Sequence, residues 1–325
     1  MSSRVDTDIT AKLDGNSDPE LSIVVPVLNE QENIRELFDQ ILKVVENNLK
    51  VSFELLFVDD GSRDRSWEII CALHDDDARV RAIRFSRNFG HQTALKAGID
   101  SANGAAVITM DADLQHPPAM IETLYAKWKE GFEVVNTAKQ DTKGLGFIKK
   151  TFTKMGYFII NLLAEVRIEP GAADFRLMDR RVVDYIRGLG EVQLLLRGIV
   201  NWLGFRSTTL EYVAETRFAG KSKYTLRQLT SLVLWGVMSF SGAPLRLSVY
   251  VGFTAASLGF GYGLFLTIRW FLVGVDIPGW TTTSALILFF SGTILLVLGI
   301  IGEYIAKIYD EIKGRPPYVI AEKTK

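Results

Sequence analysis

The sequence predicts an α/β domain with a mainly parallel sheet, followed by amphipathic interfacial helices and a two-helix transmembrane hairpin. Short apolar runs alternate with segments of helical spacing between residues 21 and 139, as in parallel sheets that are covered by helices. Acidic or amide side chains directly follow several of these runs. Farther along, Leu247 to Gly302 contains only two charged residues, Arg269 and Asp276, which is typical of membrane-spanning helices.

The composition excludes several classes of protein. The chain has 325 residues and a formal net charge of −1, whereas nucleic-acid-binding domains usually carry a basic excess, so no nucleic-acid partner is expected. Its single cysteine, Cys71, excludes an intrachain disulfide framework and a cysteine-based zinc site. The mean hydropathy of +0.14 is high for a chain with 23% charged residues, so the apolar residues must be concentrated in one part.

The α/β domain is predicted over residues 21–225. Residues 1–20 are polar and lack the apolar core of a signal peptide, so a disordered tail is expected there. The first predicted elements are strand Leu21–Pro26, helix Asn29–Glu46, strand Phe53–Val58, helix Ser66–His74, strand Val80–Phe85, helix Gln92–Ser101 and strand Ala105–Met110.

Polar clusters follow three of the predicted strands, at Asn29-Glu30, Asp59-Asp60 and Asp111-Ala112-Asp113. Parallel sheets bind their ligands beyond the carboxyl ends of the strands. The sequence therefore predicts a binding site that brings these clusters together.

Asp111 and Asp113 are candidate ligands for one divalent cation. Mg²⁺ and Mn²⁺ prefer oxygen ligands and bridge carboxylates to substrate phosphates, where they neutralise charge on a departing diphosphate. Gln115 adds an amide oxygen on the same side, and His116 is a further candidate although two prolines follow it. The alternative is a solvated turn without a metal.

Asp60 and Glu30 suit the recognition of a nucleoside. A carboxylate at a strand end can accept hydrogen bonds from a ribose hydroxyl, as acidic residues do in other nucleotide sites. Glu30 could instead stabilise the positive end of the following helix. No G-x-x-x-x-G-K motif is present, which argues against a P-loop kinase or ATPase.

Asp174 is an acidic residue in an otherwise apolar stretch. It could act as a general base, or it could pair with Arg176, Arg180 or Arg181.

A cationic stretch lies farther along, with Arg217, Lys221 and Lys223 around Gly220. Cations on a flexible loop suit the binding of phosphate groups, and they suit anionic lipid equally well.

Two segments before the apolar region are candidate interfacial helices. Residues 146–166 mix lysines with aromatic and aliphatic side chains, which suits the headgroup plane of a membrane or packing beneath the sheet. Residues 226–245 are mostly apolar and run directly into the first predicted span, so we favour the membrane surface for them.

Residues 246–306 are predicted to form two membrane spans, about 247–270 and 281–303. Each contains a long run without charge, and about 20 apolar residues cross a hydrocarbon core of roughly 30 Å. Glycines such as Gly259 permit close helix packing, within the hairpin or in a homo-oligomer.

The charges that flank the spans predict their orientation. Arg246 precedes the first span and Lys307 and Lys313 follow the second, whereas the short link between them has no lysine. By the positive-inside rule, the α/β domain and both termini, including the tail 307–325, are cytoplasmic. The sequence thus predicts a multi-pass protein of the inner (plasma) membrane.

These motifs, in this order, resemble family 2 glycosyltransferases with a GT-A, Rossmann-like fold, and most of all the polyprenyl-phosphate glycosyltransferases. That group includes bactoprenol glucosyltransferases and dolichol-phosphate mannose synthases. The likeness runs from about Leu21 to Tyr318. The motifs that carry it are Ser22–Glu30, Val58–Ser62, Ser86–Gly90, Met110–Pro118, Asp174–Asp179, Arg217–Tyr224 and the C-terminal hairpin with Gly302–Ile305 and Arg315-Pro316.

The resemblance implies a role for each candidate residue. Pro26, Leu28, Glu30 and Asp60 would hold the nucleoside of a nucleotide sugar. Asp111 and Ala112 would line its diphosphate, and Asp113 and Gln115 would bind Mg²⁺ or Mn²⁺ with Asp111. Arg217 and Lys223 would engage the phosphates of the donor, the acceptor or both, and Lys221 would join them at the acceptor phosphate.

The implied reaction is an inverting transfer of the sugar to a polyprenyl phosphate such as undecaprenyl phosphate. The acceptor oxygen is already anionic near neutral pH, so positioning and leaving-group stabilisation matter more than a strong base. Asp113 and Asp174 are the catalytic candidates, with Asp174 as the candidate base.

The sugar is left open by two departures from the family pattern. Lys221 stands where many relatives carry an acidic or polar residue, and Ala172-Ala173 precede Asp174 where bactoprenol glucosyltransferases often have Thr-Gly. UDP-glucose is the favoured donor, and GDP-mannose, UDP-GlcNAc and a UDP-aminoarabinose derivative are the alternatives.

The sequence argues against two other classes of function. A processive polysaccharide synthase would carry a Q-x-x-R-W motif and more spans, whereas this chain has Gln193-Leu-Leu-Leu-Arg197. A membrane-anchored nucleotide-binding scaffold would have no need of the full acidic set.

Overall fold

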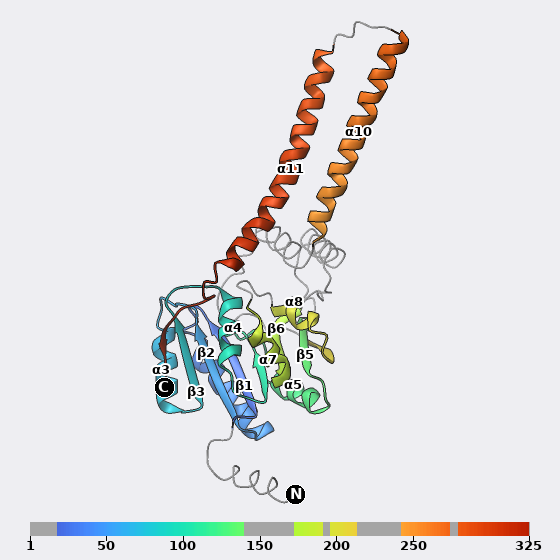
Figure 1. Ribbon diagram of the computed structural model, residues 1–325. Helices are drawn as coiled ribbons and strands as arrows, with labels where there is room; N and C mark the ends of the chain where they lie inside the picture. Colours follow the sequence, from blue (N-terminus) through green and yellow to red (C-terminus); the bar gives the residue numbers. More distant parts are fainter. Residues whose placement is uncertain (1–17, 140–171, 191–195, 213–241, 274–278, 325) are drawn as a thin grey trace, which may run out of the picture. The chain divides into compact units, whose positions relative to one another are not determined.

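The computed structural model describes residues 18–139, 172–190, 196–212, 242–273 and 279–324 (Figure 1). These residues fall into two compact units. The first contains the described residues as far as Tyr212 together with Pro316–Thr324. The second contains the two long helices that lie between Gly242 and Arg315.

One mixed sheet forms the centre of the first unit. Its strands are β1 (Leu21–Val27), β2 (Phe53–Asp59), β3 (Val80–Phe85), β4 (Ala106–Thr109), β5 (Val134–Lys139), β6 (Ala172–Asp179), β7 (Ser207–Tyr212) and β8 (Ile320–Lys323). They lie in the order β7-β5-β6-β4-β1-β2-β3-β8. The central pairs β4–β1, β1–β2 and β2–β3 are parallel, as is β5–β7. β6 is antiparallel to β4 and β5, and β8 is antiparallel to β3.

Helices cover both faces of this sheet. They are α2 (Ile34–Leu42), the π-helix η1 (Lys43–Leu49), α3 (Ser66–Asp76), α4 (His91–Ser101), α5 (Met120–Lys129), α7 (Arg180–Gly188) and α8 (Leu196–Trp202). Side chains of α2, η1, α3 and α5 join a single core cluster with the sheet. α4 packs on β1 and β2 and contacts α7.

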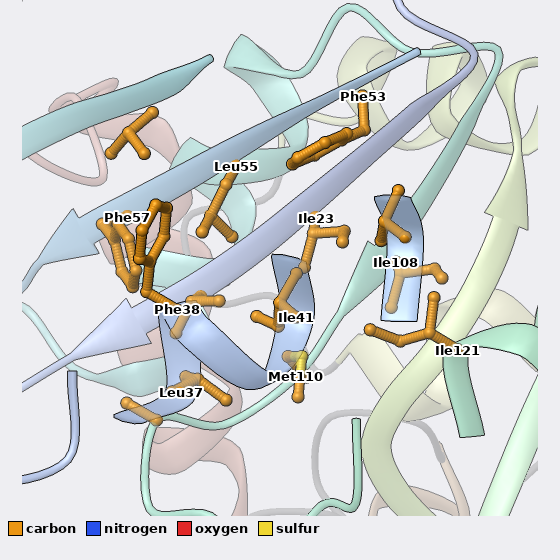
Figure 2. Close-up of a cluster of buried hydrophobic side chains, with 14 of the residues drawn as sticks. Ile23, Leu37, Phe38, Ile41, Phe53, Leu55, Phe57, Ile108, Met110 and Ile121 are labelled. Carbon is orange, nitrogen blue, oxygen red and sulfur yellow. The ribbon is translucent and has the colours of Figure 1, made fainter. Parts of the chain in front are cut away.

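Continuous apolar runs form the central strands because both of their faces are buried. Every residue of β1 and β2 is buried, as expected for parallel strands between two layers of helices. Ile23, Leu55 and Ile108 of three neighbouring strands gather in the cluster with Leu37 and Ile41 of α2 (Figure 2). The helical spacing of the α2 residues places them on the one face that meets the sheet.

The predicted α/β fold class is confirmed, with two differences in detail. The sheet is more mixed at its sides than predicted, because β6 and β8 enter antiparallel. The helix predicted from Asn29 begins only at Ile34 and continues beyond Leu42 as a π-helix. Residues 29–33 form a loop, whose hydrogen bonds are described with the site.

The chain beyond the second long helix also differs from the predicted tail at 307–325. β8 returns to the first unit, where Glu322 pairs with Arg84 and Lys323 with Ile83 in the ladder. All four residues of β8 are exposed, so this strand has no apolar alternation by which the sequence could reveal it.

The second unit is a pair of long helices, α10 (Ala243–Val273) and α11 (Trp280–Ile312), which contact each other as a hairpin (Figure 1). A Cβ atom at Gly259 would lie 2.4 Å from the ring of Phe290, so this glycine lets the two helices approach closely. The stretches Pro244–Arg269 and Ala285–Ile312 are long and apolar enough to cross a membrane.

Burial separates these helices from those of a soluble core. The most apolar 18-residue stretch of each helix is only 6% and 0% buried, respectively. Exposed apolar surface of this extent indicates contact with a membrane or a partner. The predicted interfacial segment 146–166 lies outside the described residues, as do residues 226–241 of the second one.

Candidate active site

The predicted polar clusters lie at one edge of the sheet because the strands that precede them are parallel neighbours. Asp60 N–H donates to the Val27 carbonyl at 2.9 Å, and Met110 N–H donates to the Val24 carbonyl at 3.0 Å. The loops after β1, β2 and β4 therefore leave the sheet together, as the rule for parallel sheets predicts.

The loops after β1 and β2 are joined by hydrogen bonds in both directions. Asn29 N–H donates to Ser62 Oγ and Glu30 N–H donates to Ser66 Oγ, both at 2.9 Å. Arg63 N–H donates in return to Asn29 Oδ1 at 2.9 Å. Asn29 has a φ of 56°, a left-handed conformation that asparagine tolerates better than most residues. These bonds hold residues 29–33 in a loop despite their helical spacing.

The predicted nucleoside residues differ in their exposure. Leu28 is 40% exposed at the edge of the sheet, whereas Pro26 is buried within β1. Glu30 is half-buried and accepts a hydrogen bond from Asn33 Nδ2 at 2.6 Å.

Asp60 is 2% exposed and fastens the loop after β3. Its carboxylate accepts hydrogen bonds from Phe89 N–H at 2.6 Å and from Gly90 N–H at 3.0 Å. Burial raises the pKa of Asp60 above its ordinary value, although these two N–H groups act against the shift. A Cβ atom at Gly61 would lie 2.7 Å from the Arg87 backbone, so the two loops touch.

The loop after β4 holds the predicted metal ligands. Gln115 N–H donates to Asp113 Oδ1 at 3.1 Å, and Ala112 is buried between the two aspartates. Leu114 has a φ of 59°, and strained backbone of this kind concentrates at functional sites. Asp111 Oδ1 is buried and accepts no hydrogen bond from the described residues.

His116 supports this loop and is poorly suited to bind a metal. Its Nδ1 accepts a hydrogen bond from Asp111 N–H at 3.0 Å, so the neutral ring must carry its proton on Nε2. Burial lowers the pKa of His116, although the negative charges of Asp111 and Asp113 act to raise it. The ring stacks on Phe175 at 5.1 Å and meets the edge of Tyr212. Both ring nitrogens are therefore unavailable as ligands.

Asp174, on β6, is buried in an ion-pair cluster. Arg197 of α8 donates to both carboxylate oxygens at 2.8 Å, and Gln92 Nε2 donates to Oδ2 at 2.9 Å. Arg176 lies 3.6 Å away. Burial acts to raise the pKa of Asp174, but the hydrogen bonds from His91 and Arg197 hold it well below its ordinary value. An ionised carboxylate held in this way is a weak base.

The predicted partners of Asp174 are only partly those that the structure places there. Arg176 is near it, whereas Arg180 pairs with Asp184 and Arg181 with Glu133.

His91 joins two of the candidate carboxylates and was missed by the sequence reasoning. It is the first residue of α4, and its Nε2 lies 3.4 Å from both Asp111 Oδ1 and Asp174 Oδ2. Partial desolvation acts to lower the pKa of His91, whose side chain is still 45% exposed, but the hydrogen bond to Asp174 and the charge of Asp111 outweigh it, so this pKa is raised. Its place directly after the motif Ser86–Gly90 was the available signal.

The donor set fits a divalent cation that also binds substrate phosphates. Asp111, Asp113 and Gln115 offer oxygen ligands, and Asp111 Oδ1 is a buried acceptor without a hydrogen bond from the described residues. Within those residues, no group of three or more histidine, cysteine or acidic side chains could hold a metal by itself. Arg217, Lys221 and Lys223 lie outside the described residues.

Comparisons with known proteins match both units. The model of glycosyl transferase family 2 matches residues 22–187, and the model of the GtrB C-terminal hairpin matches residues 243–308. The uncharacterized glycosyltransferase YkcC of Bacillus subtilis (strain 168) is 44% identical over 92% of each chain. The bactoprenol glucosyl transferase of Shigella phage SfII is 39% identical over 92% of this chain and 97% of its own. The prophage bactoprenol glucosyl transferase homolog of Escherichia coli (strain K12) is 37% identical over 94% of this chain and 99% of its own.

Proposed function

The chain belongs to glycosyl transferase family 2, and we propose that it transfers glucose from UDP-glucose to a polyprenyl phosphate such as undecaprenyl phosphate. The observation that carries this proposal is the meeting of the Asp60 and Asp111–Asp113 loops at one edge of the sheet, in a chain that also has two membrane-length helices. Relatives named bactoprenol glucosyl transferase share both parts over nearly their whole length.

The proposed reaction inverts the anomeric carbon. A phosphate oxygen of the acceptor attacks that carbon in line while the bond to the nucleoside diphosphate breaks. Because the attacking oxygen is already anionic, its alignment matters more than removal of a proton. Asp174 is fully ionised and held by Arg197, so we assign it the positioning of α8 and His91 rather than the role of a base.

Donor recognition is assigned to the loops that meet at the sheet edge. Pro26, Leu28, Glu30 and Asp60 hold the nucleoside, and Asp111 and Ala112 line the diphosphate. Asp111, Asp113 and Gln115 would hold Mg²⁺ or Mn²⁺, which when bound supplies positive charge for the leaving diphosphate. The phosphates of donor and acceptor are assigned to Arg217, Lys221 and Lys223.

The proposed location is the inner (plasma) membrane, with the first unit and both termini cytoplasmic. Basic residues beside the helices, Arg246, Lys307 and Lys313, support this orientation. The acceptor then reaches the site with its tail still in the bilayer. A homo-oligomer stays a prediction, since the contact of Gly259 with Phe290 lies within the hairpin.

Product analysis tests this function directly. The purified full chain in detergent, with UDP-glucose, undecaprenyl phosphate and Mn²⁺ or Mg²⁺, is expected to give a lipid carrying one hexose, identified by mass spectrometry. Asp113→Asn should lower the rate by about 100-fold or more, as expected when charge stabilisation of a leaving group is lost. Asp39→Asn, an exposed change on α2, is the matched control and should leave the rate unchanged.

Other outcomes would replace the proposal. A product from GDP-mannose, UDP-GlcNAc or a UDP-aminoarabinose derivative alone would change the donor. Lipid-linked polymers would indicate a processive synthase, and nucleotide binding without transfer would indicate a scaffold. Equal rates for Asp113→Asn and the wild-type protein would refute the metal assignment.

A further inference from the structure

The segment Tyr318–Thr324, here the C-terminal strap, is fastened to β3 along its length. Ser86 N–H donates to the Val319 carbonyl at 3.0 Å, before the β8 ladder begins. After the ladder, Ala82 N–H donates to Thr324 Oγ1 at 2.8 Å. The strap therefore belongs to the first unit although it follows the membrane-length helices in the chain.

Glu322 makes two side-chain hydrogen bonds to the sheet and helix that lie beside the strap. Its Oε1 accepts a hydrogen bond from Arg84 Nη1 at 2.9 Å, and its Oε2 accepts one from Trp67 Nε1 at 3.1 Å. The Arg84 guanidinium lies over the Trp67 ring at 5.6 Å. The Glu322 side chain is 54% exposed, and an exposed ion pair stabilises little by itself. Its importance lies in the contact that Arg84 makes with Asp59.

Arg84 compensates the buried charge of Asp59. Arg84 Nε lies 3.3 Å from Asp59 Oδ2, a fully buried oxygen that accepts no hydrogen bond from the described residues. The other Asp59 oxygen accepts a hydrogen bond from Ser62 N–H at 2.9 Å, and Ser62 Oγ accepts one from Asn29 N–H. A chain of polar contacts thus runs from Glu322 to both loops of the proposed nucleoside site.

Aromatic contacts also connect the strap to the loop after β3, whose backbone holds the Asp60 carboxylate. Tyr318 stacks on Phe85 with the ring centroids 5.1 Å apart, and Phe85 meets Phe89 edge-on at 5.7 Å. Phe89 N–H is one of the two groups that hold the Asp60 carboxylate.

We propose that Glu322 is a positioning residue for the donor nucleoside, which acts through Arg84 and Asp59 on the loops that carry Asn29 and Asp60. This inference rests on the proposed function. Glu322 touches no substrate in this role. It keeps the Arg84 charge on Asp59, so the turn Asp60–Ser62 is already in place when the donor arrives, and a preorganised site binds more tightly.

Glu322→Gln in the full chain tests this role. The amide oxygen still accepts the Trp67 hydrogen bond, but the charge that orients Arg84 is gone. Lys323→Gln is the matched control, because its side chain leaves the same strand on the opposite side. Both variants are compared by hydrogen–deuterium exchange and by the KM values for UDP-glucose and undecaprenyl phosphate.

For Glu322→Gln we expect faster exchange in peptides covering 60–62 and 86–90 and a roughly three- to tenfold higher KM for the donor. The KM for the acceptor and the Lys323→Gln values should match those of the wild type. Unchanged donor KM overturns the inference, whether or not exchange becomes faster. Equal rises in both KM values also overturn it, because they would indicate a general loss of structure.

Failure of the proposed function is recognised separately. If the wild-type protein transfers no sugar, that function fails, and Glu322 is then judged by exchange and by the affinity for UDP and GDP. Unchanged exchange at 60–62 and unchanged nucleotide affinity in Glu322→Gln would overturn the inference there too.

Discussion

Asp174 illustrates how its surroundings decide what a carboxylate can do. Arg197 donates hydrogen bonds to both of its oxygens, Gln92 donates to one of them, and His91 lies 3.4 Å from the same group. Burial alone would favour the protonated acid, but these partners favour the ionised form and keep the pKa of Asp174 low. Its chemistry is that of a fixed anion which organises cations around it.

Acid unfolding provides a test at this position. The folded-state pKa is below the unfolded value of about 3.9, so the ionised group stabilises the fold above that value and ceases to do so as pH falls through the folded pKa. Asp174→Asn leaves Arg176 without its buried partner and should cost about 3 kcal/mol at pH 7. The difference in unfolding free energy from the wild type should persist to pH 5 and shrink only below about pH 4.

Denaturant unfolding followed by tryptophan fluorescence measures this difference. Asp184→Asn removes an exposed carboxylate that pairs with Arg180 and should change the stability by less than about 1 kcal/mol. A loss of the Asp174 effect between pH 5 and pH 6 would contradict a depressed pKa.

The sequence predicted the acidic residues of the candidate site, but it did not predict the side chains that contact them. Asp60, Asp111 and Asp113 follow buried strands, so the topology of the sheet alone brings their loops together. The partners of Asp174 depend on tertiary packing, which adds Arg197 from α8 to the nearby Arg176 and leaves Arg180 and Arg181 with other carboxylates. His91 could not be found by spacing for the same reason, since it meets its carboxylates only when α4 packs on β1.

His91, the first residue of helix α4, lies close to both Asp111 and Asp174. The position of α4 is fixed by the packing of its middle turns on the sheet. Gly98 faces Val24 of β1, where a Cβ atom would lie 2.1 Å from Val24 Cγ1. Valine is stiff at χ1, so this side chain has little freedom to move away. α4 can therefore lie close to the sheet only with glycine at this position.

Gly98→Ala should destabilise the first unit by about 1–3 kcal/mol, the usual cost of overpacking, although alanine is the better helix former. It should also slow transfer, because a shift of α4 displaces His91 from Asp111. Thermal unfolding and the glycolipid assay measure the two effects. Gly188→Ala is the control, since nothing lies within 4 Å of its added Cβ. A stabilised, fully active Gly98→Ala protein would disprove the close contact.

Elements differ in how far the sequence reveals them. The strands of the parallel core are continuous apolar runs, and β3 spans the residues predicted for it. The loop at 29–33 has helical spacing, but its backbone N–H groups bond to Ser62, Asp64 and Ser66 instead. Such side-chain contacts between distant loops outweigh the local helix propensity, and no periodic pattern in the sequence reveals them.

The two units correspond to a charge-rich part of the sequence and an almost uncharged one. The basic residues beside the uncharged part give a prediction of the membrane topology. In a Cys71→Ser background, Asp276→Cys in the link should react with a membrane-impermeant maleimide added to intact cells. Lys313→Cys should react only after permeabilisation, because basic residues are retained on the cytoplasmic side. Labelling is read on gels, and the reverse pattern would show that the orientation is wrong.

In the wild-type chain, Cys71 is a poor target for the maleimide. Burial raises the pKa of its thiol, so little of the reactive thiolate exists near neutral pH. The wild-type chain should therefore label only slowly, even after permeabilisation.

The order of synthesis follows from the place of β8. A ribosome delivers the chain from its N-terminus, so β3 is made long before its neighbour β8, and both long helices are made in between. Until then β3 presents an unpaired edge, a surface prone to join other chains. Completion of the sheet must wait for the hairpin to leave the ribosome, so the catalytic unit is finished only after its membrane anchor has been made.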